Sequence, residues 1–190
     1  MQITSHGLWA MIHGLGFGGL YLLAFSGALV DLYRSTAPAV AYPPSPARGR
    51  FLNVYLILMV VLAWLAVVSG AYIVYPWYRT AAPPGTIDLS LYPQRLLMAN
   101  PTTSGWHSLG MEWKEHVAWL APISITMVAF VFIRYGNELR NHVQLRRAVL
   151  GFAWVAFLAA ALAGFLGAVI DKQAPVKGGA TIQLTQGGER

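Results

Sequence analysis

The sequence contains no cysteine and unusually little charge. Of its 190 residues, 11% are charged and 56% are hydrophobic, whereas soluble domains have about 25% charged and 45–50% apolar residues. The absence of cysteine excludes disulfides, thiolate nucleophiles, iron–sulfur clusters and covalent attachment of c-type haem, which needs a CxxCH motif. The shortage of charge excludes a soluble globular protein, and the high apolar content excludes a disordered one.

The hydrophobic residues gather in four long blocks, and the segments between them hold nearly every charge. The blocks are Leu8–Val30, Leu52–Tyr75, Val117–Ile133 and Ala148–Ile170. Runs of about 17–25 apolar residues match the hydrocarbon core of a bilayer. The first block follows a segment without lysine or arginine and exceeds the ~7–15 residues of a signal-peptide core, so we interpret it as a retained span.

We therefore predict an all-α polytopic membrane protein that folds as a four-transmembrane-helix bundle. Its domain covers residues 1–175, with spans at about 8–30, 52–75, 116–134 and 148–170 and a long outer-side loop at 76–114. Within that loop, a helix is expected to start at residues 102–104. A polar C-terminal tail at 176–190 is expected to lie loosely in solvent or on a partner.

The basic residues give the chain a net charge of +6, but they are spread over loop ends, so we expect no nucleic-acid partner. Seven of the 13 lie in the two short loops after the first and third blocks: Arg34, Arg48, Arg50, Arg134, Arg140, Arg146 and Arg147. The others, Arg79, Arg95, Lys114, Lys172, Lys177 and Arg190, are spread over a longer stretch of chain. The positive-inside rule then places both termini on the periplasmic side of a bacterial inner membrane.

Aromatic and small residues predict surfaces for partners. Five of the seven tryptophans map to the predicted outer side: Trp9, Trp77, Trp106, Trp113 and Trp119. An ordinary aromatic belt would divide them between both interfaces, so this face is predicted to dock other membrane subunits or a periplasmic cytochrome. The fourth block has no polar residue and repeats small residues, as at Ala156, Ala160 and Gly164, which is typical of a helix that packs against neighbours or a partner subunit.

Two histidines predict a b-type haem near the outer face. His13 lies inside the first block and His116 opens the third; neutral imidazoles from two facing helices can complete the coordination of haem iron. Gly14 directly follows His13, and small residues at this position would admit a flat macrocycle. Arg79, with Arg95 or Lys114 as alternatives, could pair with the haem propionates. The competing interpretation is that the glycines serve helix packing and that His13 is hydrogen-bonded to its surroundings.

Other ligands remain open at these positions. Glu112 and His116 are four residues apart and share a helix face, so together with His6 and His13 they could hold a mononuclear metal ion. The magnesium of a chlorophyll-type pigment could take one histidine. A quinone is also compatible with a histidine, a carboxylate and aromatic side chains at the membrane interface.

Four spans with His13 and His116 near one face resemble the small four-helix bacterial membrane proteins of predicted cytochrome-b type. Dihaem bundles need a second histidine pair at another depth, so the resemblance implies at most one haem. It implies an integral membrane subunit of a respiratory or photosynthetic electron-transfer complex, exchanging electrons with quinol or an outer-side partner. The alternative is a cofactor-free anchoring or structural subunit. We do not expect an enzyme acting alone, because no nucleophile, base and orienting group converge outside the histidine set.

The predicted orientation can be tested with C-terminal reporter fusions. Because both termini are expected outside the cytoplasm, a reporter that works only in the periplasm should be active when fused to the C-terminus. Activity of a reporter that works only in the cytoplasm would contradict this orientation.

Overall fold

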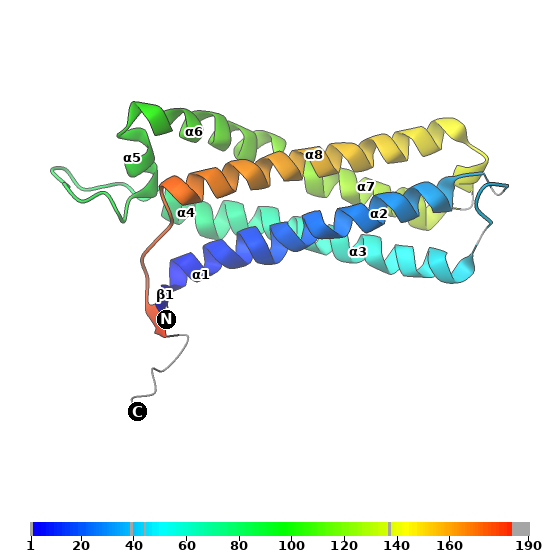
Figure 1. Cartoon of the computed structure of the whole chain (residues 1–190), viewed down its shortest axis with the longest axis horizontal. Helices are drawn as coiled ribbons and strands as arrows, with labels where there is room; N and C mark the ends of the chain where they lie inside the picture. Colours follow the sequence, from blue (N-terminus) through cyan, green and yellow to red (C-terminus); the bar gives the residue numbers. More distant parts are fainter. Residues whose placement is uncertain (1, 39, 44, 137, 184–190) are drawn as a thin grey trace.

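The computed structural model describes residues 2–38, 40–43, 45–136 and 138–183. Four long helices make up most of this chain (Figure 1): Ser5–Thr36, Pro46–Tyr78, Pro101–Tyr135 and Val143–Gln173. Each is long and apolar enough to cross a membrane, which confirms the prediction of four apolar helices. Large apolar side chains such as Leu23 and Phe130 are exposed on the outside of the bundle, as contact with lipid would require.

Three of the long helices contain a π-helical segment, a widened turn closed by i→i+5 hydrogen bonds. The first consists of α1 (Ser5–Met11), the π-helical η1 (Ile12–Gly19) and α2 (Leu20–Thr36). The second consists of α3 (Pro46–Ser69), η2 (Gly70–Val74) and α4 (Tyr75–Tyr78), and the third of α6 (Pro101–Glu112), η3 (Trp113–Val117) and α7 (Leu120–Tyr135). The fourth is α8 (Val143–Gln173); α5 (Pro93–Met98), the 3-10 helix η4 (Glu138–Arg140) and strands β1 (Gln2–Thr4) and β2 (Thr181–Gln183) complete the described elements.

Local sequence signals explain where the helices begin. The Ser45 hydroxyl accepts a hydrogen bond from the backbone N–H of Arg48, and Pro46 occupies the first helical position. Asn100 caps the third helix in the same way, since its side chain accepts from the backbone N–H of Thr102. This helix therefore starts at Pro101, slightly before the expected position, and continues into the span.

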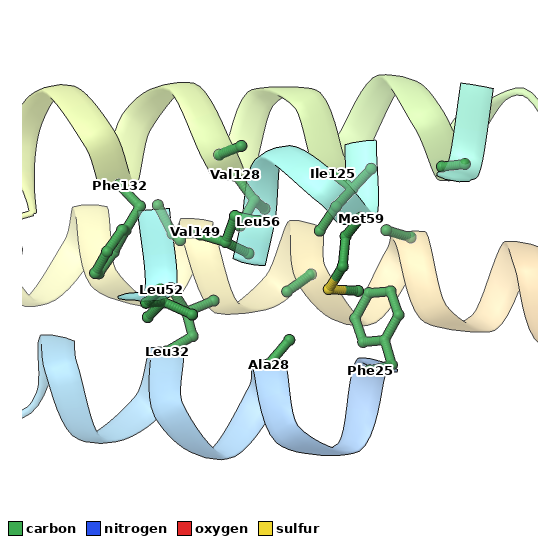
Figure 2. Close-up of a cluster of buried hydrophobic side chains, with 14 of the residues drawn as sticks. Phe25, Ala28, Leu32, Leu52, Leu56, Met59, Ile125, Val128, Phe132 and Val149 are labelled. Carbon is green, nitrogen blue, oxygen red and sulfur yellow. The ribbon is translucent and has the colours of Figure 1, made fainter. Parts of the chain in front are cut away.

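The four helices pack in a ring around a buried apolar core. Both α2 and α7 pack against α3 and α8, so the first and third long helices occupy opposite corners of the bundle. The core lies toward the end where the chain turns between Thr36 and Pro46, which we call the loop end (Figure 2). Its residues include Phe25, Ala28, Leu32, Leu52, Leu56, Met59, Ile125, Val128, Phe132 and Val149.

At the opposite end, which we call the strand end, the C-terminal segment turns back onto the N-terminus (Figure 1). Strands β1 and β2 pair antiparallel, and Ala174 and Val176 are buried in a small second cluster. Gly178 and Gly179 have φ values of 112° and 76°, which favour glycine in this turn. The expectation of a loose tail is thus wrong for residues 176–183, because Val176 is buried, the carbonyls of Gly178 and Ala180 accept hydrogen bonds from the N-terminal backbone, and Thr181–Gln183 pair with β1. The rest of that tail, including Arg190, lies outside the described residues.

The guanidinium of Arg140 links the two inter-helix loops at the loop end. Arg140 Nη1 donates hydrogen bonds to the carbonyl oxygens of Ala37, at 3.0 Å, and Tyr42, at 2.7 Å. These acceptors follow the first long helix, whereas Arg140 follows the third. The side chain therefore holds opposite corners of the bundle together.

Replacing Arg140 with alanine should lower the free energy of unfolding by about 1–3 kcal/mol, because two partly buried carbonyls lose a charged donor. Arg147→Ala is the matched control, since the Arg147 side chain is exposed and makes no hydrogen bond within the described ranges. Thermal unfolding in detergent measures both. Equal midpoints for the two variants would contradict this role of Arg140.

Candidate functional site

The three π-helical segments lie at one level of the bundle, between the core and the strand end. His13 in η1 faces Gly70 in η2, and Tyr75, directly after η2, is hydrogen-bonded to Glu115 in η3. All residues of the three segments are described, and none of them is buried. The residues of these segments are thus partly or fully exposed, and π-helical turns occur frequently at functional sites.

His13 is held in a defined orientation at this level. Its Nδ1 lies 3.1 Å from Ser69 Oγ, and the Ser69 hydroxyl donates to the carbonyl of Ala66 at 3.2 Å. Because the hydroxyl proton is used on Ala66, the Ser69 oxygen accepts a hydrogen bond from Nδ1–H of His13. We assign this tautomer from the hydrogen-bond network. It leaves the lone pair of Nε2 free, and Nε2 has no hydrogen-bond partner among the described residues.

Gly70 is required for this placement of His13. A Cβ at Gly70 would lie 2.6 Å from Cε1 and 3.2 Å from Nε2 of the imidazole, well inside the contact distance. Sequence analysis missed Gly70, because nothing in the second block indicates that its Ser69-Gly70 pair faces a histidine on another helix.

Gly14, in contrast, does not mediate helix packing. It is exposed, and no described atom lies within 4 Å of where its Cβ would stand. Gly16 would meet only the side chain of Ile12, one turn earlier on its own helix. Helix η1 therefore presents bare backbone beside His13.

His116 lies apart from His13, on the helix at the opposite corner of the bundle. Its Nδ1 is 3.1 Å from the carbonyl oxygen of Glu112 and 3.4 Å from the Glu112 carboxylate, and its side chain is 68% exposed. The structure thus does not bring the two imidazoles face to face. They share one feature: each has Nδ1 engaged by an oxygen, which leaves Nε2 available.

The residues considered for a mononuclear metal ion are also separated. His6 stacks on Trp77 with ring centroids 3.9 Å apart, and its Nδ1 is 3.4 Å from the carbonyl oxygen of Lys177. Glu112 stays with His116 on the third helix. In the part of the chain that the structure describes, no three His, Asp or Glu side chains converge as metal ligands would.

Arg79 belongs to a separate network at the strand end. Its Nη1 donates to the Tyr75 hydroxyl at 2.7 Å, and that hydroxyl donates to Glu115 Oε1 at 2.5 Å. The hydrogen bond with Tyr75 raises the pKa of Arg79 above its ordinary value, so the guanidinium stays charged. Close by, the Tyr78 hydroxyl and His107 Nδ1 are 2.7 Å apart. Arg79 is thus tied to the second and third helices rather than to His13.

Lys114 is the basic side chain that reaches into the bundle near His13. Its Nζ lies 3.3 Å from where a Cβ at Gly167 would stand, so it crosses from η3 to α8. The lysine charge acts electrostatically on His13 and is itself attracted by Asp171. Ionisable side chains within membrane spans are costly and mark functional sites by default.

No family model, curated protein or solved structure matches this chain.

Gly70→Ala should destabilise the protein by about 1–3 kcal/mol, because the added methyl group must displace the imidazole of His13. Gly151→Ala is the matched control: it also lies in a long helix, but no described atom lies within 4 Å of its Cβ position. The control should be neutral or stabilising by up to about 1 kcal/mol, since alanine favours helix. Thermal unfolding in detergent separates the two, and equal stability would disprove the close contact.

Proposed function

We propose that this protein is an integral membrane subunit of an electron-transfer complex and binds one b-type haem at the level of η1, η2 and η3, with His13 as an axial ligand. The observation that carries the proposal is the orientation of His13. Its Nδ1 lies 3.1 Å from Ser69 Oγ, and in the tautomer assigned from this contact Nδ1–H is engaged and the lone pair of Nε2 is available. Histidines that ligate metals almost always donate their other ring N–H to a neighbouring acceptor, which fixes the tautomer and raises ligand basicity.

The surrounding residues fit this group in three respects. A chain without cysteine can hold haem only non-covalently, as b-type haem is held. Gly14 and Gly16, close to His13 in the chain, carry no side chain that would obstruct a flat macrocycle. Lys114, whose charge acts on His13, would pair with a propionate, whereas Arg79 is engaged by Tyr75. Haem would supply one-electron transfer between membrane quinol and a redox partner at the strand end.

His116 is the second candidate haem ligand. The proposal therefore has two cases: both histidines ligate the haem, or His13 alone does. Ligation of one haem by both histidines of one chain needs a rearrangement of the third helix, since His116 is exposed at the opposite corner. If His13 alone held the haem, any second ligand would come from solvent or from a second chain. A bis-imidazole haem is low-spin and a five-coordinate one is high-spin, so the absorption spectrum distinguishes the cases.

The alternative function is a cofactor-free anchoring or structural subunit. It is favoured by His116, which is bonded to its own helix and largely exposed. The tryptophan-rich docking surface that the sequence predicts is weaker support for an anchoring subunit. Trp77 stacks on His6, and Trp113 Nε1 donates to the carbonyl of Ala159 at 3.2 Å. These two indoles therefore make their contacts within the same chain.

Absorption spectra of the protein purified in mild detergent test the proposal. We expect a reduced b-type α-band that is lost in His13→Ala, because the oriented ligand is removed, and haem affinity lowered about tenfold or more in Ser69→Ala. His142→Ala is the control, since His142 lies at the loop end beside Glu138.

His116→Ala reports which case of ligation applies. Loss of the α-band, or a change from low spin to high spin, assigns His116 as the second ligand, and an unchanged spectrum assigns the second position to another group. Absence of a Soret band after expression with ample haem would refute haem binding and favour the anchoring subunit. A magnesium-pigment spectrum would refute it in favour of a chlorophyll-type ligand on the same nitrogen.

A further inference from the structure

A hollow of about 550 Å³ lies at the strand end, outside the four long helices. The chain between Arg79 and Met98 encloses it, where Figure 1 shows a loop projecting beyond α4 and α5. Its polar lining consists of two arginines, two threonines and one glutamine: Arg79, Arg95, Thr80, Thr86 and Gln94. All five can donate hydrogen bonds.

The hollow carries positive charge, and no carboxylate within the described residues lines it; Glu115, which is linked to Arg79 through the Tyr75 hydroxyl, lies outside the lining. Arg79 and Arg95 both line it. Asp88 is the only acidic residue between them in sequence, and its Oδ1 accepts a hydrogen bond from the backbone N–H of Ser90 at 2.9 Å. This hydrogen bond holds the pKa of Asp88 below its usual range, so the carboxylate is satisfied by its own turn.

The elements that carry the donors are anchored. Arg79 lies over the ring of Tyr75, with 5.5 Å from Cζ to the ring centroid; only Nη1 is used on the tyrosine, and a guanidinium has five N–H donors. Arg95 projects from α5, which is fixed by Pro93 and Leu97, both buried. In the loop that also lines the hollow, the backbone N–H of Thr86 donates a hydrogen bond to the carbonyl oxygen of Pro83 at 3.2 Å.

We propose that this hollow binds an oxyanion, a phosphate or carboxylate group, between Arg79 and Arg95. Guanidinium groups bind such groups through paired, charge-assisted hydrogen bonds, and the threonine hydroxyls and glutamine amide supply further donors. The volume lies within the ~300–1,000 Å³ of ligand pockets, so the anion can belong to a larger molecule. Because the hollow adjoins the end of the second long helix, a free oxyanion and a phospholipid head group both reach it. This site is independent of haem binding.

Calorimetric titration of the full chain in detergent with inorganic phosphate tests the proposal. Arg95→Gln should weaken binding about tenfold or more, because a charge-assisted hydrogen bond is lost. Lys172→Gln is the matched control: it removes the same charge from an exposed position at the strand end that does not line the hollow. The control should change affinity less than about twofold, since exposed charges act weakly at a distance.

Nanodiscs distinguish the two sources of the anion. Thermal unfolding is compared in phosphatidylcholine discs with and without phosphatidylglycerol. Stabilisation by phosphatidylglycerol that disappears in Arg95→Gln but persists in Lys172→Gln assigns a lipid head group. Phosphate binding that depends on Arg95, without such stabilisation, assigns a soluble oxyanion. Either result supports the site.

Chemical modification of the unaltered protein removes any dependence on folding of the variants. Phosphate should protect Arg79 and Arg95 from phenylglyoxal but leave Arg50, exposed at the loop end, reactive. The proposal is overturned if protection is equal at all three arginines or absent. It is also overturned if neither phosphate binding nor lipid stabilisation depends on Arg95.

Discussion

An apolar segment long enough to cross a membrane must satisfy its backbone hydrogen bonds internally, and the four long helices of this chain meet this constraint. It explains why each of the four apolar blocks forms one long helix. It also explains how the helices change shape at η1, η2 and η3. A π-helical turn keeps the backbone bonded while it widens the helix, so the bundle can open at this level without exposing peptide groups. His13, Ser69 and Lys114 lie at or beside these turns, where Gly70 leaves room for the side chain of His13 and Gly167 for that of Lys114.

The bundle is consequently divided into two halves with different properties. Toward the loop end, buried apolar residues such as Phe25 and Leu56 pack tightly, and Arg140 joins the two connections. Toward the strand end lie four of the five histidines, His6, His13, His107 and His116, and the described C-terminal segment is paired with the N-terminus. We infer that the first half provides stability and the second provides chemistry. The free Nε2 of His13 and the arginine-lined hollow both lie on this second side of the core.

Much of the fold could be predicted from the sequence, because it depends on local properties. The four helices follow from apolar length, and their starts follow from polar caps before Pro46 and Pro101. The candidate site was predicted only in part. His13 was singled out by its position in an apolar block, but its partners Ser69 and Gly70 lie on another helix. The pairing of His13 with His116 assumed that the first and third helices face each other, and their corner positions are set by packing across the bundle.

The sequence by itself determined that the chain forms four long apolar helices and which side chains are available for chemistry. The four helices and the set of available side chains both depend on amino-acid composition and on the spacing of residues along the chain. Only the tertiary structure decided which of those side chains meet. The free Nε2 of His13, the outward direction of His116, the attachment of Arg79 to Tyr75 and the return of the C-terminal segment to β1 all depend on contacts between distant segments. The physical reason is that helix formation is satisfied within each segment, whereas a site requires several helices to pack in one particular arrangement.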